Sequence, residues 1–266
     1  MDAIALHVAT RSDSGRVRKI NEDAVGVDPA ARVVVLADGL ATRSGADIAS
    51  RLAVRSLLDH LRDMARPAPG ADAMRKAFAS AERAIAERVA SDPALVGMGA
   101  TAVAVRFGEE RLHVGHIGDA RLYRLRGSRL DRLTVDHSFV QTQLATGRVT
   151  EDEARASRSR HFVTRALGSG DQALPDVAEH AIEPGDVYLL CTDGLHELVD
   201  ERELADALRA LAENAELCAE TLVTMANDRG GTDNVSVIVV RVGDERPAHP
   251  VVRPGFLHRL RAMFGA

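Results

Sequence analysis

Four aspartates stand where an apolar run of the chain meets a glycine or a polar turn: Asp38, Asp119, Asp193 and Asp233. Two of them lie near the end of similar sequence motifs, VVVLADG around Asp38 and YLLCTDG around Asp193. A carboxylate at the end of a buried strand is costly when it stands alone, because burial removes the water that stabilises its charge. Several such carboxylates brought together would repel one another unless a cation held them. The pattern therefore predicts a site for hard divalent metal ions.

The rest of the composition agrees with oxygen ligands rather than a histidine or cysteine cage. Mg²⁺ and Mn²⁺ prefer carboxylate, carbonyl and water oxygens. The two cysteines, Cys191 and Cys218, have neither the spacing of metal ligands nor that of a disulfide framework, which is typical of a reducing compartment.

The bulk composition is that of a soluble globular chain with one core. Of its 266 residues, 45% are hydrophobic and 27% are charged. A net charge of −5 argues against nucleic acid as the main partner, because phosphate binding needs a basic field. The opening MDAIALHVATR has too short an apolar stretch for a signal peptide, and no stretch of the chain has the length of a membrane span. We expect a cytoplasmic protein.

The elements that must position the aspartates follow from hydrophobic periodicity. We expect strands at about 4–10, 31–37, 99–107, 111–118, 120–130, 177–182, 186–191 and 234–242, and helices at about 44–64, 74–89, 200–211 and 214–228. The strands at 111–118 and 120–130 suggest a β-meander joined by a turn at Gly118 and Asp119.

Helix pairs separated by antiparallel strands predict an α+β fold, a four-layer α–β–β–α sandwich with two central antiparallel sheets flanked by helix pairs. We assign residues 1–243 to one domain, with a polar surface flap at about 138–168 that carries a capping box at Thr150 and Glu153. Residues 244–266 form a proline-containing linker and a short basic amphipathic tail. A partner helix or a membrane surface is an alternative for the tail, but we expect self-docking or fraying.

Eight short motifs surround the aspartates in a fixed order. They are SDSGRVRKINED at 12–23, LADG at 36–39, GATA at 99–102, IGDAR at 117–121, TVDHS at 134–138, TRALG at 164–168, CTDGL at 191–195 and GTDN at 231–234. This series resembles the metal-dependent Ser/Thr protein phosphatases of the type-2C or PPM family, bacterial type, over about residues 5–242. A motif series in one order is far more specific than any single Asp-Gly.

The resemblance implies a site with two Mg²⁺ or Mn²⁺ ions and a third, weaker one. Asp38 would bridge the first two ions, Gly39 would lend its carbonyl oxygen, and Asp193 and Asp233 would complete the pair. Asp119, with Asp193, would hold the third ion. Taken alone, Asp119 could instead shape a hairpin turn.

Other residues would support these ions. Asp23, and with it Glu22, would hold metal-bound waters, and orientation is often set at such positions. Asn234 would help by hydrogen bonding beside the site. Arg18 would take the substrate phosphate, because a guanidinium fork matches two phosphate oxygens. A surface salt bridge is the other interpretation of Arg18. Arg18, Asp38, Asp193 and Asp233 form the implied catalytic set.

The remaining polar residues have plainer interpretations. We expect Asp136 and His137 to cap a helix that starts near Ser138, and Arg165 to brace the flap. The cluster formed by Arg155, Arg158, Arg160 and His161 is either a solvated face or a surface that favours acidic phosphosites. His7, His113 and His116 lie in strand patterns and are expected to be packed or surface histidines.

The chain departs from the family pattern after the first Asp-Gly. Bacterial members usually continue with Met-Gly-Gly, and eukaryotic members carry a histidine there that is taken as the proton donor to the leaving alkoxide. Here Leu40 follows, within a loop at 40–45. A general acid contributes about 10²–10⁴-fold. A metal-bound water could serve as the proton donor instead, and among the side chains His196 is a candidate for that role only in the loosest sense.

Phosphate monoesters hydrolyse so slowly that their catalysts supply accelerations of up to ~10²¹-fold. The resemblance implies a protein serine/threonine phosphatase in which water held between two metal ions attacks phosphoserine or phosphothreonine directly. Phosphorylated proteins and a cognate bacterial Ser/Thr kinase would be its partners, and we expect a monomer. Two alternatives stay open: a regulatory phosphoprotein-binding module of weak catalytic power, and a phosphatase for anti-sigma-antagonist-type proteins. The flap weighs against the second.

Overall fold

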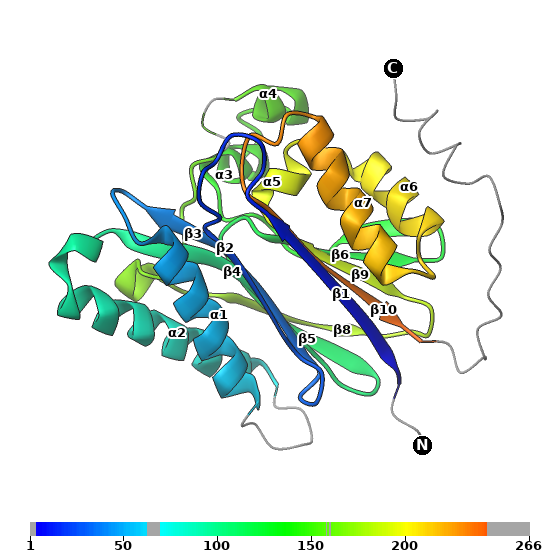
Figure 1. Ribbon diagram of the computed structural model, residues 1–266, viewed down its shortest axis with the longest axis horizontal. Helices are drawn as coiled ribbons and strands as arrows, with labels where there is room; N and C mark the ends of the chain where they lie inside the picture. The colour runs from blue at the N-terminus through cyan, green and yellow to red at the C-terminus, as the bar shows by residue number, and fades with distance from the viewer. Residues whose placement is uncertain (1–3, 63–69, 158, 160, 244–266) are drawn as a thin grey trace.

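The computed structural model describes residues 4–62, 70–157, 159 and 161–243. In this part of the chain, two five-stranded antiparallel sheets lie face to face (Figure 1). The first sheet contains β1 (Leu6–Asp13), β10 (Val235–Val242), β9 (Val187–Cys191), β6 (Arg121–Arg126) and β7 (Arg129–Arg132), in that order. The second contains β2 (Asp23–Asp28), β3 (Val33–Ala41), β4 (Met98–Phe107), β5 (Arg111–Ile117) and β8 (Asp176–Ala181), in that order.

Helix pairs cover the outer faces of the two sheets. The pair α1 (Ala46–Arg62) and α2 (Ala71–Ser91) packs on the second sheet, and the pair α6 (Glu201–Ala210) and α7 (Ala215–Asp228) packs on the first (Figure 1). The predicted α–β–β–α sandwich is therefore confirmed. The structure also has shorter helices that we did not place, among them α5 (Asp193–His196) at the end of β9.

The side chains of β3 show why this layering follows from the sequence. Val33, Val35 and Ala37 pack among the residues of α1 and α2, whereas Val34 and Leu36 pack against the other sheet. A strand turns successive side chains to opposite faces. Because both faces of β3 are covered by protein, its apolar residues are consecutive rather than alternating with polar ones.

Two strands were not predicted correctly. The first is β2, which contains Gly26 and has few consecutive apolar residues. A Cβ on Gly26 would lie 2.5 Å from Cγ1 of Val54, so α1 can approach this strand only because the side chain is missing. The second is the expected strand at 120–130, which is a hairpin of β6 and β7 that reverses at Gly127, with a φ of +59°.

The expected β-meander through Gly118 and Asp119 is also wrong. β5 belongs to the second sheet and β6 to the first, so this turn carries the chain from one sheet to the other. The turn at 183–186, between β8 and β9, does the same. A local turn sequence does not distinguish a hairpin from a crossing between sheets, because the choice depends on which partner strand is available. Asp119 therefore lies at the junction of the two sheets.

The flap contains α3 (Phe139–Ala145) and α4 (Glu151–Ala156), and it lies at the same end of the sandwich as α5 (Figure 1). The capping box of Thr150 and Glu153 is confirmed at the start of α4. The predicted caps of α3 are wrong: Ser138, not Asp136 or His137, accepts the hydrogen bond from the backbone N–H of Gln141.

The tail at 244–266 lies outside the described residues, and so do Arg158 and Arg160 of the expected arginine cluster. No helix within the described ranges has both the length and the apolar character needed to cross a membrane.

A buried ion pair fastens the end of the sandwich away from the flap. Arg126 donates from Nε and Nη2 to the two carboxylate oxygens of Asp186, both at 2.8 Å, and Asp186 is 1% exposed. The hydroxyl of Tyr188 and the backbone N–H of Glu183 also donate to Oδ2 of Asp186. The carboxylate thus depends on a complete set of donors in place of water.

We predict that Arg126→Met lowers the free energy of unfolding by about 2–3 kcal/mol, because it leaves a buried carboxylate without its cation. Urea titration followed by far-ultraviolet circular dichroism measures this, since the chain has no Trp. Arg129→Met is the matched control on the adjacent strand: that side chain is 81% exposed and its loss should cost less than about 0.5 kcal/mol. Equal midpoints for the two variants would contradict the prediction.

Candidate metal centre

The two sheets bring aspartates from distant parts of the chain to one end of the sandwich. Asp23 begins β2 and is paired in register with Asp38 near the end of β3. Asp193 follows β9, and Asp233 precedes β10, its antiparallel neighbour. A hydrogen bond joins the two sets across the sheets: Thr192 Oγ1, next to Asp193, donates to Asp23 Oδ2 at 3.0 Å.

The carboxyls are buried or half-buried and repel one another: Asp23 and Asp119 are buried, and Asp38 and Asp193 are half-buried. Burial is the largest cause that raises the pKa of Asp38 well above its usual range, followed by the charges of Asp23, Asp193, Asp119 and Asp233. Burial and then Asp119 are the first causes that raise the pKa of Asp193. Burial also raises the pKa of Asp23 to about 6 and that of Asp119 to about 7. Without a cation, this cluster is electrostatically unfavourable at neutral pH.

The residues fit hard divalent ions. One oxygen of Asp23, Oδ1, is buried and has no hydrogen-bond partner within the described chain. The groups around it are carboxylates, which are the ligands that Mg²⁺ and Mn²⁺ prefer. Asp38, Asp193 and Asp233 would hold the ions, with Asp119 beside Asp193. These ligand roles stay predictions: the aspartates are near enough for their charges to act on one another, but among the described residues the group whose ligand atoms lie within 4.8 Å of one another is His161, Asp193 and Glu197.

Glycine at two positions lets the backbone close around this cluster. A Cβ on Gly39 would lie 2.1 Å from the carbonyl oxygen of Ala46 and 2.8 Å from that of Glu22. A Cβ on Gly194 would lie 1.9 Å from the carbonyl oxygen of Asn234. Each glycine directly follows an aspartate of the cluster. The repeated Asp-Gly thus reflects close backbone approach, in addition to any role of the Gly39 carbonyl as a ligand.

Asn234 fastens the loop that carries Glu22 and Arg18. Its Oδ1 accepts from the backbone N–H of Glu22 at 2.8 Å, and its Nδ2 donates to the carbonyl oxygens of Ser14 at 3.1 Å and Ile20 at 2.9 Å. Asn234 is 3% exposed. Its side chain therefore orients the loop beside the carboxylates, in agreement with the predicted hydrogen-bonding position.

Arg18 lies at the rim of the cluster. Its Nη2 donates to Asp233 Oδ2 at 2.7 Å, while 49% of its side chain is exposed. The salt-bridge interpretation is thus realised in this state. It does not exclude phosphate binding, because a guanidinium has five N–H donors and this contact uses one.

His196 does not suit the role of general acid. Its Nε2 lies 3.0 Å from the carbonyl oxygen of Asp119, and the residue is half-buried. Burial, followed by the charge of Arg121, lowers the pKa of His196 to about 3. The ring is therefore neutral at physiological pH and carries no acidic proton to give.

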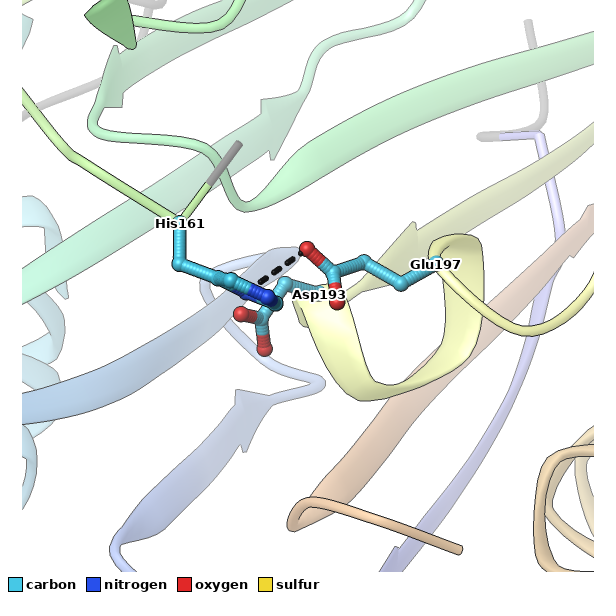
Figure 2. A group of neighbouring side chains, drawn as sticks. All are labelled: His161, Asp193 and Glu197. Carbon is cyan, nitrogen blue, oxygen red and sulfur yellow. Dashed lines mark ion pairs between the residues drawn. The ribbon is translucent and has the colours of Figure 1, made fainter. Parts of the chain in front are cut away.

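The sequence placed His161 in the basic cluster of the flap, but it gave no sign that this residue would lie beside the metal site. Figure 2 shows it reaching from the flap toward Asp193 and Glu197. Its Nδ1 lies 2.9 Å from Glu197 Oε1, and one ligand atom from each of the three side chains lies within 4.8 Å of the others. The sequence offered a clue only for Glu197, which stands one helical turn after Asp193. Nothing local indicated that the flap would fold over this turn.

Arg165 braces the flap as predicted. Its Nη1 donates to Asp176 Oδ1 at 2.9 Å and to the carbonyl oxygen of Leu174 at 3.2 Å. The histidines in the strands are packed or at the surface, also as predicted: His113 and His116 are buried, and His7 is exposed.

Comparisons with known proteins agree with this geometry. A family model described as Protein phosphatase 2C matches residues 15–226. The serine/threonine protein phosphatase PstP of Mycobacterium tuberculosis is 40% identical over 244 residues, which are 91% of this chain and 46% of that protein. The serine/threonine phosphatase stp of Listeria welshimeri is 32% identical over 241 residues, 88% of this chain and 95% of that protein. The chain thus spans about half the length of PstP and matches nearly all of the Listeria protein.

Solved structures share the fold. A crystal structure of the M. tuberculosis PstP superposes with a TM-score of 0.83 at 36% identity, covering 91% of this chain and 100% of that one. A structure of the PstP catalytic domain in complex with two manganese ions superposes with a TM-score of 0.81 at 36% identity and the same coverage.

The raised pKa values lead to a prediction about the metal-free protein. Carboxyls whose folded pKa lies above the unfolded one stay protonated when folded while the unfolded chain has released the protons. Stability of the metal-free protein should therefore fall as the pH rises from about 4 to about 7. Thermal unfolding in EDTA across this range measures it.

Asp38→Asn should weaken the loss of stability that the metal-free protein shows as the pH rises, because it removes one of the repelling carboxylates. It should raise the metal-free Tm at pH 7.5 by several degrees, since about 1 kcal/mol corresponds to ~2–4 °C for a domain near this size. It should also abolish most of the stabilisation by added Mn²⁺. Asp206→Asn, at an exposed ion pair of α6, is the control and should change neither. A lower metal-free Tm for Asp38→Asn would refute the repulsion argument.

Proposed function

Because the chain belongs to the protein phosphatase 2C family, we propose that it is a Mg²⁺- or Mn²⁺-dependent protein serine/threonine phosphatase whose catalytic domain is residues 1–243. The observation that carries this proposal is the cluster of Asp23, Asp38, Asp119 and Asp193, two buried and two half-buried, whose mutual repulsion a cation would relieve. The similarity to the Listeria phosphatase over nearly its full length supports it. So does the presence of two manganese ions in the structure of the PstP catalytic domain.

When bound, two divalent ions would supply a positive charge for the phosphoryl oxygens and lower the pKa of water for direct attack. The task of this chain is to hold the ions and shape the space beside them. Asp38, from one sheet, and Asp193 and Asp233, from the other, would bind the pair. The junction of the sheets fixes their separation.

Arg18 would bind the substrate phosphate. It comes from the loop that Asn234 orients, and its exposed guanidinium lies against Asp233. A planar fork can meet two phosphate oxygens while a third group, here Asp233, restrains its position.

We further propose that the substrates are phosphorylated proteins and that the enzyme, a cytoplasmic monomer, opposes a cognate bacterial Ser/Thr kinase. The net charge of −5 supports a protein substrate over nucleic acid. The flap that folds over Asp193 supports a general phosphoprotein phosphatase, since the members devoted to anti-sigma-antagonist-type proteins tend to have shortened it.

The first test is hydrolysis of a phosphothreonine peptide with and without Mn²⁺. Wild type should require the ion, and Asp38→Asn and Asp193→Asn should each lower kcat/KM by at least about 10³-fold, because electrostatic stabilisation of the transferred group is the largest contribution to such catalysis. Activity without metal, or full activity in both variants, would refute the mechanism. A wild type that binds Mn²⁺ yet hydrolyses nothing would favour the regulatory module.

The second test addresses Arg18. Arg18→Ala should lower kcat/KM about 10–100-fold, the range for loss of a charge-assisted hydrogen bond, and should raise KM. Lys19→Ala removes a neighbouring exposed positive charge and serves as the control, with a change of less than about 3-fold. Equal effects of the two substitutions would contradict a specific phosphate contact and would mean that Arg18 contributes only general positive charge.

A further inference from the structure

His137 forms hydrogen bonds with both backbone polar groups of Gly118, the residue before Asp119. The backbone N–H of His137 donates to the carbonyl oxygen of Gly118 at 2.7 Å. The backbone N–H of Gly118 donates in turn to the ring nitrogen Nδ1 of His137 at 3.1 Å. The ring is buried, with the residue 4% exposed. One histidine thus satisfies both polar groups of the glycine that turns the chain from one sheet to the other.

These contacts define the state of the ring. Because a backbone N–H can only donate, Nδ1 must offer a lone pair, so the ring is neutral with its proton on Nε2. That nitrogen lies 3.1 Å from Asp176 Oδ2, without good hydrogen-bond geometry. The well-aligned hydrogen bond of this side chain is therefore the one that its Nδ1 accepts from the backbone N–H of Gly118.

The neighbouring residues add further hydrogen bonds between the segments 118–122 and 133–137. Arg121 donates from Nε and Nη2 to the carboxylate of Asp136, at 3.0 and 2.6 Å. The backbone N–H of Leu122 donates to Thr134 Oγ1 at 3.1 Å. On the other side, the Asp119 carbonyl lies 3.0 Å from His196 Nε2. The backbone around Asp119 is held from both sides, and the Asp119 carboxyl is near enough to Asp193 for its charge to act on that residue.

The same histidine also carries the base of the flap. The backbone N–H of Thr164, at the end of the flap, donates to the carbonyl oxygen of His137 at 2.7 Å. The next residue, Ser138, forms an isolated β-bridge with Val163. A displacement of the flap base would therefore pull directly on the residue that accepts from Gly118.

We propose that His137 is a positioning residue that fixes the orientation of Asp119 and couples it to the seating of the flap. The link from Asp119 to metal rests on the proposed function, whereas the link from His137 to Gly118 does not. In this arrangement, a substrate that lifts the flap alters the carboxylate next to Asp193, and a cation bound there favours the seated flap.

Two substitutions separate the roles of the ring. His137→Asn places an amide oxygen near the position of Nδ1 and can accept from Gly118. His137→Gln places its amide near the position of Nε2 in the wild-type ring, toward Asp176. The buried backbone N–H of Gly118 is then left without an acceptor. His113→Gln, at another buried histidine on β5, is the control for loss of a ring.

The first readout needs no metal. Amide hydrogen exchange of residues 118–120 and 162–164, measured by NMR on the folded metal-free protein, should be at least about 10-fold faster in His137→Gln at both segments. It should stay within about 3-fold of wild type in His137→Asn and His113→Gln. Acceleration at 118–120 alone would overturn the coupling to the flap. Similar acceleration in the Asn and Gln variants would overturn the role of Nδ1.

The second readout is a double-mutant cycle with Asp119. Calorimetric titration with Mn²⁺ should give about 10-fold weaker binding at the weakest site in His137→Gln, and no further change when Asp119→Ala is already present. Additive effects would overturn the proposal. If the Gln variant does not fold, the Asn variant still tests the proposal: fast amide exchange at 118–120 in His137→Asn would overturn it. If wild type hydrolyses no phosphopeptide, the proposed function fails while the exchange result stands.

Discussion

The mutual repulsion of buried carboxylates is the constraint on which this structure depends. Asp23, Asp38 and Asp193 come together where two sheets meet, and burial and neighbouring charge raise the pKa of each. A fold selected for stability alone would not gather acids in this way. The rest of the sandwich, with apolar layers on both faces of each sheet, contributes the free energy that holds them there.

Short-range devices then orient what the sheets bring together. Asn234 fixes the loop of Glu22 and Arg18, and the glycines after Asp38 and Asp193 let backbone segments meet at distances that no side chain allows. His137 and His196 hold the backbone around Asp119. These groups are buried and hydrogen-bonded, so they restrict movement of the carboxylates without adding to their charge. Preorganisation of this kind is what electrostatic catalysis requires.

The flap connects this rigid centre to the surface. Its base is closed by the hydrogen bond from Thr164 to His137, and it brings His161 over Asp193 and Glu197. The base of the flap is thus hydrogen-bonded, through His137, to the turn that carries Asp119. In the proposed enzyme, the residue that seats the base of the flap therefore also holds the turn that carries Asp119.

Much of this protein could be predicted from its sequence. Consecutive apolar residues in the strands and helical periodicity predicted the sandwich, and the series of motifs, with its two Asp-Gly pairs, pointed to the acids. These are local patterns, set by side-chain period and by the cost of burying charge. Only the tertiary structure decided that Gly118 and Asp119 cross between sheets, that Ser138 rather than His137 caps α3, and that His161 reaches the site. Each of these depends on a partner remote in the chain, and no local period encodes which remote partner a residue will meet.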